Sequence, residues 1–457
     1  MMEAEGGFKN DIISYIIVLL LALGIGYAVS IYGIALGTTL IVLPFAIALI
    51  TMIFNNPKVG LLITLHYSFF SNGLQRFTSP DIPFGLGVDA ILVLSLISGF
   101  FKSNKGSTNS WVFYLSLMWF SYALLELVNP EATSKEAWFY SGRGVALYQI
   151  MVIPLTLMFA NKKKDMDQFI NIWIIWSLIA SLYAFKMTYI GLTAGEQKWL
   201  DDGGKITHFI QGRLRIFSFF SDAGQSGAAM AEACLFCLLM AVGPYEKKVK
   251  IRYGIIAAIT FWGYALSGSR GPLFVLASGG FLYLFLIRNF KVIVIGATIG
   301  FLAFAFLKYT SIGNTNYQIY RMRTALDPND ASLQVRLNNQ KLLRTYLKSR
   351  PLGGGIGSGA GFGERFYPGR FLSGVALDSW YVKIWVETGI IGLVIHIIHL
   401  IIVLIVGIVN CFKIKNPDIR QKMMGIVCGY FGILCGSYGN QIFGQFPTGP
   451  IMYMSMV

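Results

Sequence analysis

One stretch of the chain decides the fold class: residues 379–411 read SWYVKIWVETGIIGLVIHIIHLIIVLIVGIVNC. From Gly389 to Cys411 this stretch contains no charged residue. An α-helix needs about 20 mostly apolar residues to cross the hydrocarbon core of a bilayer. The stretch therefore predicts a membrane-spanning helix, and similar apolar runs recur along the whole chain.

The composition indicates a membrane protein throughout. Of the 457 residues 55% are hydrophobic and 13% are charged, with a mean hydropathy of +0.61. Soluble domains have about 25% charged residues, so this chain has too little polar surface to cover a soluble globule. Its net charge of +15 would suggest nucleic-acid binding in a soluble protein. Here the basic residues form short clusters between apolar runs, so no nucleic-acid partner is expected.

The chain is predicted to be an all-α polytopic membrane protein with 13–14 transmembrane helices. Residues 1–307 would contain the first eleven helices, residues 308–378 a helical extracytoplasmic loop subdomain, and residues 379–457 the C-terminal helices. The thirteen predicted spans are Ile12–Ile31, Ala35–Phe54, Val59–Asn72, Gly85–Phe101, Trp111–Leu127, Val145–Ala160, Phe169–Ile190, Ser226–Val242, Tyr253–Leu266, Leu273–Ile287, Val292–Leu307, Ser379–Cys411 and Gly425–Ser437.

The two ends of the chain carry further expectations. The segment Pro450–Val457 resembles the start of a fourteenth span but is too short to cross, so either the native chain continues or this tail lies at the membrane interface. The acidic N-terminus lacks the basic flank and cleavage site of a signal peptide. The first helix is therefore expected to be a permanent anchor.

The loop charges predict the orientation. The N-terminus and every second loop contain 17 of the 37 basic residues, which by the positive-inside rule places the N-terminus in the cytoplasm. Of these 17 residues 14 are Lys, whereas 12 of the other 20 are Arg. The Arg guanidinium is a planar, bidentate donor for carboxylate or phosphate. The outer side, with loops Asn129–Gly144, Gly191–Gln225 and Lys308–Leu377, is therefore predicted to hold an anion.

Two motifs precede the long loop. The first runs from Gly212 to Gly227 and contains Arg213, Arg215, Asp222 and Gln225 at the entry to a span. Asp222 and Gln225, at the start of this helix, are candidate substrate ligands. These arginines could hold an anionic headgroup, or they could simply reach the membrane surface. The second is the turn Ser267-Gly-Ser-Arg270-Gly-Pro272, where the N-terminus of the next helix also favours an anion.

Arg270 could also have a purely structural role. An ionisable residue at this depth in a membrane protein is a functional candidate. A pairing with Asp222 or Glu232 would explain it without any ligand. We therefore take an anion as the favoured partner of Arg270 and keep the internal ion pair as the alternative.

The long loop Lys308–Leu377 contains seven arginines and only three acidic residues. Asp330 or Ser332 is expected to cap a helix that runs to about Ser349. The arginines Arg336, Arg344 and Arg350 on or next to this helix are candidate substrate ligands. The glycine-rich run that begins at Pro351 lacks the Gly-Lys-Ser/Thr ending of an ATP-binding P-loop, so it is interpreted as a flexible loop that exposes its backbone.

Two carboxylates follow the loop, in the segment Asp378-Ser-Trp-Tyr-Val-Lys-Ile-Trp-Val-Glu387. Asp378 lies where a helix N-cap would lie, and a capping role and a role as general base are equally supported. Glu387 is a second candidate for the catalytic base. The four histidines lack acids or cysteines at metal-ligand spacing, and the five cysteines lie in or beside apolar segments. Neither a metal site, a cofactor nor a disulfide framework is predicted.

Taken together, these motifs resemble the superfamily of O-antigen ligases and O-antigen polymerases. The resemblance covers roughly Arg213–Gly392. It rests on the order and spacing of the arginine-containing helix entry, the Ser-Gly-Ser-Arg270-Gly turn, Arg336 followed by Pro351-Leu-Gly-Gly-Gly-Ile-Gly, and Glu387-x-Gly389-x-x-Gly392.

The resemblance implies a metal-independent glycosyltransferase of the bacterial inner membrane, with its active site on the extracytoplasmic face. Its donor would be an oligosaccharide linked to undecaprenyl diphosphate, and its surroundings membrane lipids. Arg213 or Arg215, together with Arg270, would match the arginines that contact the diphosphate, and Arg336 would match the loop arginine. A chain-length regulator is a candidate partner.

The resemblance supports two functions, and charged residues within the predicted spans suggest a third. Ligases commonly have a histidine at the position that matches Asp378, and no histidine lies between Lys308 and Asp378. This difference favours a polymerase of repeat units for O-antigen, capsule or exopolysaccharide. The first alternative is a ligase that transfers the glycan to lipid A core or another acceptor. The second is a flippase for lipid-linked glycan, with intramembrane charges lining the route.

Overall fold

The computed structural model describes residues 16, 18–27, 29–31, 34–77, 84–103, 108–210 and 212–457. Its longer helices are α2 Ile34–Asn55, α3 Pro57–Leu74, α4 Phe84–Lys102, α5 Trp111–Leu125, α7 Tyr148–Phe159, α8 Lys163–Phe185, α11 Ala223–Val242, α12 Lys247–Leu266, α13 Gly271–Leu286, α14 Phe290–Tyr309, α16 Ala331–Leu347, α18 Trp380–Lys413 and α19 Pro417–Gly436.

The shorter elements lie in the connections. They are η1 Glu126–Val128, α6 Lys135–Gly142, η2 Arg143–Leu147, η3 Lys186–Ile190, α9 Ala194–Trp199, η4 Leu200–Gly204, α10 Lys205–His208, β1 Phe209–Ile210, β2 Arg213–Leu214, α15 Tyr317–Thr324, α17 Ala360–Phe366, η5 Phe371–Gly374 and α20 Thr448–Ser455. In the described part of the chain, the antiparallel pair β1–β2 is the whole of the sheet structure.

The structure confirms an all-α polytopic membrane protein. Twelve of the thirteen predicted spans coincide with described helices, whereas Ile12–Ile31 and the N-terminal segment before it lie partly or wholly outside the described residues. By length and apolarity, seven helical segments in the described residues can cross a bilayer. They are Phe84–Lys102, Trp111–Val128, Lys135–Phe159, Lys163–Ile190, Ala223–Val242, Phe290–Tyr309 and Trp380–Lys413.

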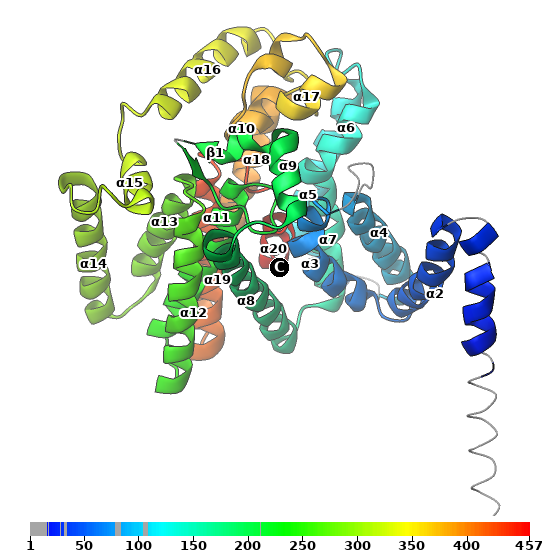
Figure 1. Ribbon diagram of the computed structural model, residues 1–457. Coiled ribbons are helices and arrows are strands. Elements are labelled where there is room, and N and C mark those ends of the chain that lie inside the picture. The colour runs from blue at the N-terminus through cyan, green and yellow to red at the C-terminus, as the bar shows by residue number, and fades with distance from the viewer. Residues whose placement is uncertain are drawn as a thin grey trace, which may run out of the picture.

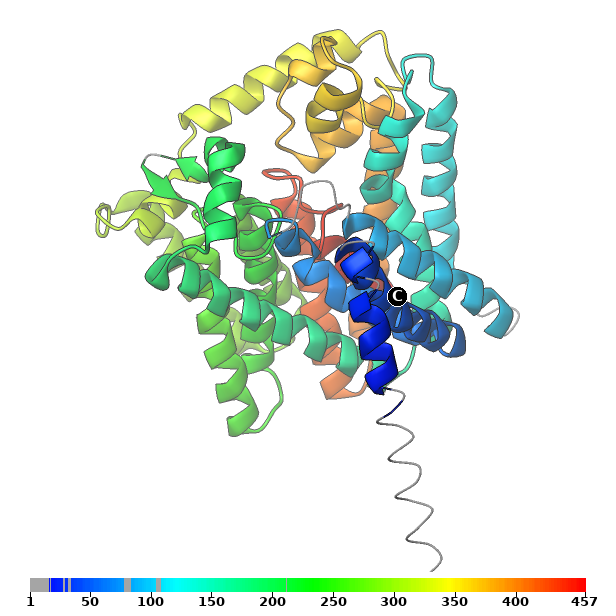
Figure 2. The same cartoon turned by 45° about the vertical axis from the view of Figure 1, so that its right-hand side comes forward.

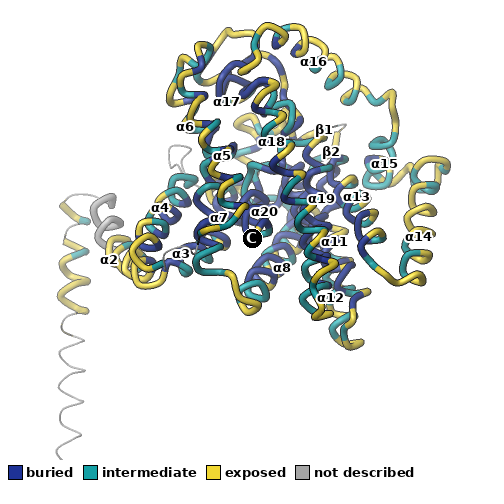
Figure 3. The backbone as a smooth tube through the Cα atoms, turned by 180° about the vertical axis from the view of Figure 1, so that it is seen from behind, coloured by how far each residue is buried: buried dark blue, intermediate teal, exposed yellow. Residues whose placement is uncertain are grey.

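The helices surround a buried centre. Helix α11 packs against α8, α12, α13 and α19, and most of its residues are buried (Figure 3). Helix α14 stands at one side of the bundle with no buried residue (Figure 1). At one end of the bundle, α16 and α17 of the long loop lie above the ends of the spanning helices (Figure 2). We call this the loop end.

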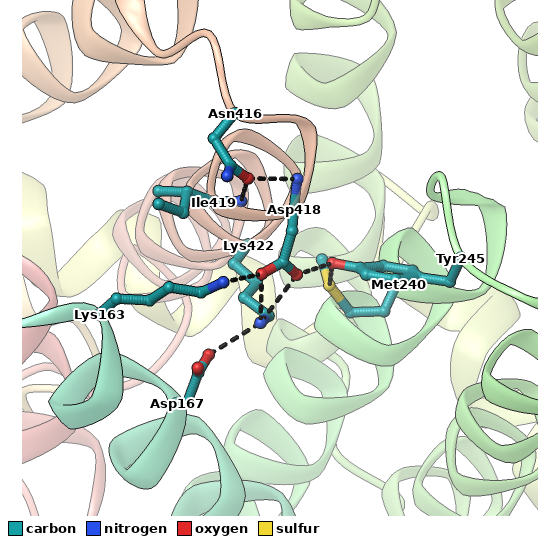
Figure 4. A network of polar contacts seen from close by, with 8 residues as sticks. All are labelled: Lys163, Asp167, Met240, Tyr245, Asn416, Asp418, Ile419 and Lys422. Carbon is teal, nitrogen blue, oxygen red and sulfur yellow. Dashed lines mark hydrogen bonds and ion pairs between the residues drawn. The ribbon is translucent and has the colours of Figure 1, made fainter.

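At the opposite end a network of charges joins three parts of the bundle (Figure 4). The Asp418 carboxylate lies 3.0 Å from Lys163 Nζ of α8 and 2.8 Å from Lys422 Nζ of α19. Lys422 also contacts Asp167 at 2.8 Å, and Tyr245 donates its hydroxyl hydrogen to Asp418 at 3.2 Å. The network therefore fixes α8, the α11–α12 connection and α19 relative to one another.

The structure corrects the interpretation of the glycine-rich run. Residues 353–359 are all buried, so this segment is neither exposed nor a free loop. It packs into a break in α18 at Gly389, whose φ of 66° and ψ of −171° are not helical. Gly354 N donates to Val386 O at 2.8 Å, and Ile391 N donates to Pro351 O at 3.4 Å.

Glycine is required on both sides of this contact. A Cβ on Gly353, where φ is 75°, would lie 2.7 Å from Val386 O and 2.9 Å from the nitrogen of Thr388. A Cβ on Gly389 would meet the backbone of Pro351 and Gly353. The run after Pro351 and the Glu387-x-Gly389 motif are therefore two halves of one packing contact, which anchors the long loop to α18.

The C-terminal segment is also different from the expectation. It forms the short helix α20, and Ile451, Met452 and Tyr453 are fully buried. Helix α20 packs against α7, α3 and α19. The prediction that this tail lies at the membrane interface is wrong, because its apolar side chains are enclosed by the bundle.

Candidate functional site

The turn between α12 and α13, residues 267–271, is the centre of the candidate site. Ser269 N donates to Ser267 Oγ at 3.2 Å, and Ser269 Oγ donates to Ala223 O at 2.8 Å. Gly268 takes a positive φ of 56°, which leads the chain directly into the next helix. The small residues of the sequence motif thus build a tight turn that presents Arg270 at the N-terminus of α13.

Two further arginines contact the same turn. Arg215 Nη2 donates to Ser269 Oγ at 2.6 Å. Arg321, from α15 of the long loop, donates from Nε to Gly268 O at 3.0 Å. Arg215 and Arg270 were predicted as site residues, whereas Arg321 was only counted among the loop arginines. The structure therefore brings together three guanidinium groups that are distant in the sequence.

The internal partner of Arg270 is neither Asp222 nor Glu232, the two acids that the sequence suggested. Arg270 Nη1 forms an ion pair with Asp330 Oδ2. The other carboxylate oxygen of Asp330 accepts a hydrogen bond from Leu333 N at 3.0 Å and so caps α16, as predicted. Burial favours the neutral acid, but the hydrogen bonds from Arg270 and from backbone N–H groups, together with the charge of Arg270, outweigh it and lower the pKa of Asp330.

Arg336 approaches the turn from above, on α16. Its Nε donates to Asp378 Oδ2 at 3.0 Å. A Cβ on Gly439 would lie 3.9 Å from Arg336 Nη1 and 3.4 Å from Gly271 Cα. Gly439 thus lies between the Arg336 guanidinium and the N-terminus of α13. We call Arg215, Arg270, Arg321 and Arg336 the arginine cluster.

Asp378 does not cap α18, so the capping alternative is wrong. The N-cap of α18 is Ser379, whose side chain makes no capping hydrogen bond. Asp378 instead pairs with Arg336, and its side chain is 48% exposed. This exposure leaves the carboxylate open to a substrate beside the arginine cluster.

Two helix N-termini meet beside the cluster. Asp222 caps α11 by accepting from Gly224 N at 2.7 Å and Gln225 N at 3.0 Å. Because a Cβ on Gly227 would lie 3.0 Å from Pro272 Cγ, the first turns of α11 and α13 are in close contact. The N-terminal ends of helices carry partial positive charge and favour anions.

The electrostatics of the cluster favour the binding of an anion. Burial, followed by the like charge of Arg321, lowers the pKa of Arg215. Burial, followed by the charge of Arg270, lowers the pKa of Arg321. Arg215 Nε and the Tyr317 hydroxyl are buried and have no hydrogen-bond partner within the described residues. Neighbouring like charges and unsatisfied donors are stabilised when a ligand with several anionic oxygens binds between them.

Other predicted site residues lie outside the cluster or have structural partners. Arg213 and Arg344 are exposed. Gln225 is buried and donates to Thr448 Oγ1 at 2.6 Å. Arg350 pairs with Glu131 Oε1 at 3.1 Å and stacks over Tyr346.

Glu387 is fully buried, with 0% exposure, between α18, α6 and the glycine-rich run. Its carboxylate accepts from Ser141 Oγ at 3.1 Å and lies 3.7 Å from Lys383 Nζ. The backbone N–H of Gly357 is a further hydrogen-bond donor to it. These contacts favour a structural role for Glu387 over the catalytic role that the sequence suggested.

Arg321 and Tyr317 are the site residues that sequence reasoning missed. Both lie on α15, which Asn316 caps by accepting from Gln318 N and Ile319 N. The combination of an Asn cap and a short basic helix after a span was a local signal for α15. No spacing rule distinguishes Arg321 from the six other arginines of the long loop, because Arg321 contacts a turn about fifty residues earlier in the sequence.

Fold and site together define a multi-pass membrane protein with a cluster of arginines at the loop end of its helix bundle. Residues 255–397 match the model of a family described as O-antigen ligase. The matched region includes the Arg270 turn, the long loop and the first part of α18, and it begins after Arg215 and Asp222. This match is consistent with the superfamily of O-antigen ligases and polymerases and confirms the resemblance. No curated protein matches the chain.

Proposed function

We propose that this protein is a glycosyltransferase that polymerises oligosaccharide repeat units carried on undecaprenyl diphosphate. The observation that carries the proposal is the meeting of four arginines and two helix N-termini around the turn at Arg270. An O-antigen ligase-like region around this turn supports the same chemistry. In this proposal the N-terminus is cytoplasmic, and the loop end faces the extracytoplasmic side of the inner membrane.

The arginine cluster would act on the leaving group. As the bond between the anomeric carbon and the diphosphate oxygen breaks, the electron pair moves to the diphosphate. Fixed guanidinium groups placed where this charge develops stabilise the transition state without reorganising. This function needs no metal, which agrees with the family resemblance.

Asp378 would act on the acceptor. Its half-exposed carboxylate lies beside Arg336, so an acceptor hydroxyl that reaches it is also close to the bound diphosphate. The hydroxyl oxygen forms the new bond to the anomeric carbon, and its proton passes to Asp378. The pairing with Arg336 orients the Asp378 carboxylate between turnovers.

A ligase is the second candidate function, because the matching family model is described as O-antigen ligase. The Asp at position 378, where ligases commonly have a histidine, favours the polymerase. Deletion of the gene separates the two functions in cells. Loss of a polymerase leaves single lipid-linked repeats, whereas loss of a ligase leaves long lipid-linked polymer.

The direct test uses purified protein in lipid nanodiscs with lipid-linked repeat units, and it follows glycan length by gel electrophoresis. We expect elongation by the wild type and a loss of about tenfold or more in rate for Arg270→Gln, since a hydrogen bond to a charged group contributes about 1.5–3 kcal/mol. Lys348→Gln, an exposed cation of the same subdomain, is the control. Full activity of Arg270→Gln would refute the proposal.

A further inference from the structure

A cavity lies beside the arginine cluster and has no role in the proposed mechanism. It has a volume of about 360 Å³ and is lined by residues 359–362 at the start of α17, Arg365, Leu377, Lys383 and Gln441. Ligand pockets in proteins occupy about 300–1,000 Å³. The cavity is therefore large enough for a mono- or disaccharide.

The cavity and the arginine cluster share one wall. Leu377 lines the cavity, and the next residue, Asp378, pairs with Arg336. Gln441 donates from Nε2 to Leu377 O, and the same connection contains Gly439 beside Arg336 and Gly271. A ligand in the cavity would therefore be one residue away from the candidate base and next to the candidate diphosphate site.

The lining suits a sugar ring. Phe362 contributes an aromatic side chain, and its neighbour Gly361 faces open space, since a Cβ there would have nothing within 4 Å. Lys383, Arg365 and the Gln441 amide add polar groups. An aromatic surface with a few polar groups is the usual composition of a site for a small polar ligand.

The charge of the lining is positive. Among the described residues, no acidic side chain lines the cavity, whereas Arg365 and Lys383 do. Lys383 lies 3.7 Å from the buried Glu387, which partly compensates its charge. Arg365 packs over the rings of Tyr140 and Phe366, at 5.0 and 4.9 Å, and no carboxylate in the described residues lies within ion-pair distance of it. Arg365 is exposed, so its guanidinium can contact an anionic group of a ligand in the cavity.

We propose that this cavity binds the terminal residue of the acceptor glycan and that Arg365 selects a sugar with a carboxylate, such as a uronic acid. The inference rests on the proposed function, because the acceptor enters only through that function. It adds a substrate class: a glycan whose acceptor end contains an anionic sugar.

The test measures binding without any lipid-linked donor, so it does not depend on turnover. The probes are methyl β-D-glucuronide and methyl β-D-glucoside, titrated into full-length protein in nanodiscs and followed by saturation-transfer NMR. We expect the glucuronide to bind about two- to fivefold more tightly, which is the gain expected for an ion pair with a solvent-exposed arginine. Arg365→Gln should abolish this preference, and Lys348→Gln should preserve it.

A second variant tests the position of the site. Gly361→Phe should fill the open space and weaken binding of both probes, while the protein unfolds at the same temperature as the wild type. Equal affinity for the two probes, or a preference that survives Arg365→Gln, would overturn the charge selection. Unchanged binding in Gly361→Phe would overturn the assignment of this cavity. Arg270→Gln should bind the glucuronide normally, which separates this proposal from the proposed catalysis.

Discussion

Replacing Gly389 by alanine should detach the long loop from α18. Gly389 has φ 66° and ψ −171°, a conformation that only glycine adopts readily and that costs other residues about 1–3 kcal/mol. The new Cβ would also lie within 3.0 Å of the Pro351 carbonyl oxygen and 2.5 Å from Gly353 N. Both neighbours are backbone atoms, so the clash cannot be relieved by a side-chain rotation.

The magnitude follows from the contacts that must be lost. If the loop moves away, the hydrogen bonds Gly354 N to Val386 O and Ile391 N to Pro351 O are lost, at about 0.5–1.5 kcal/mol each. Together with the backbone term, Gly389→Ala should lower the free energy of unfolding by about 2–6 kcal/mol. Glycan elongation should fall as well, because Asp378 and Arg336 lie on the two elements that separate.

The assay is denaturant unfolding in mixed micelles, followed by tryptophan fluorescence. Gly374→Ala is the matched control, since it lies in the same loop with nothing within 4 Å of its Cβ position and no positive φ. That variant should stay within about 0.5 kcal/mol of the wild type. Equal stability of Gly389→Ala and Gly374→Ala would refute the docking of the glycine-rich run into α18.

Three further predictions test individual residues. Arg321→Gln should slow elongation about tenfold or more, by loss of a charge-assisted contact with the diphosphate, and Arg323→Gln, an arginine of the same helix, serves as control in the same rate assay. Burial lowers the pKa of His208, so the folded state favours the neutral imidazole. The stability that His208 contributes is therefore complete above its ordinary pKa of 6.5 and decreases as the pH falls below 6.5. His208→Gln should therefore show a smaller loss of unfolding free energy between about pH 7.5 and 5.5 than the wild type. Arg350→Gln should lower the free energy of unfolding by about 1 kcal/mol or less, as expected for a partly exposed ion pair, with elongation retained; a large loss of elongation at normal stability would restore its predicted role in substrate binding.

Much of the membrane fold was predictable because it depends on local composition. The thickness of the bilayer fixes the length of an apolar run, so each described helix that matches a predicted span could be found without knowing its neighbours. Arg270 could also be singled out from local sequence, since a charged residue between small residues at the start of a membrane helix is unusual in itself. Asp330 was found from local capping chemistry.

The remaining features depend on contacts between distant segments. Arg321 reaches Gly268, and Pro351 reaches Ile391, across parts of the chain that no periodicity connects. The run after Pro351 was misinterpreted because glycine allows both a flexible loop and a tightly packed one. The capping role of Asp378 could be excluded only from the structure, in which Ser379 is the N-cap of α18 and Asp378 pairs with Arg336.

Binding of a diphosphate by the arginine cluster can be measured as the affinity for farnesyl diphosphate, by microscale thermophoresis in nanodiscs. We expect the wild type to bind the diphosphate more tightly than farnesyl monophosphate. Arg270→Gln and Arg321→Gln should each weaken diphosphate binding about tenfold or more, whereas Lys348→Gln should not. Equal affinities for the wild type and both arginine variants would show that the cluster does not bind the diphosphate.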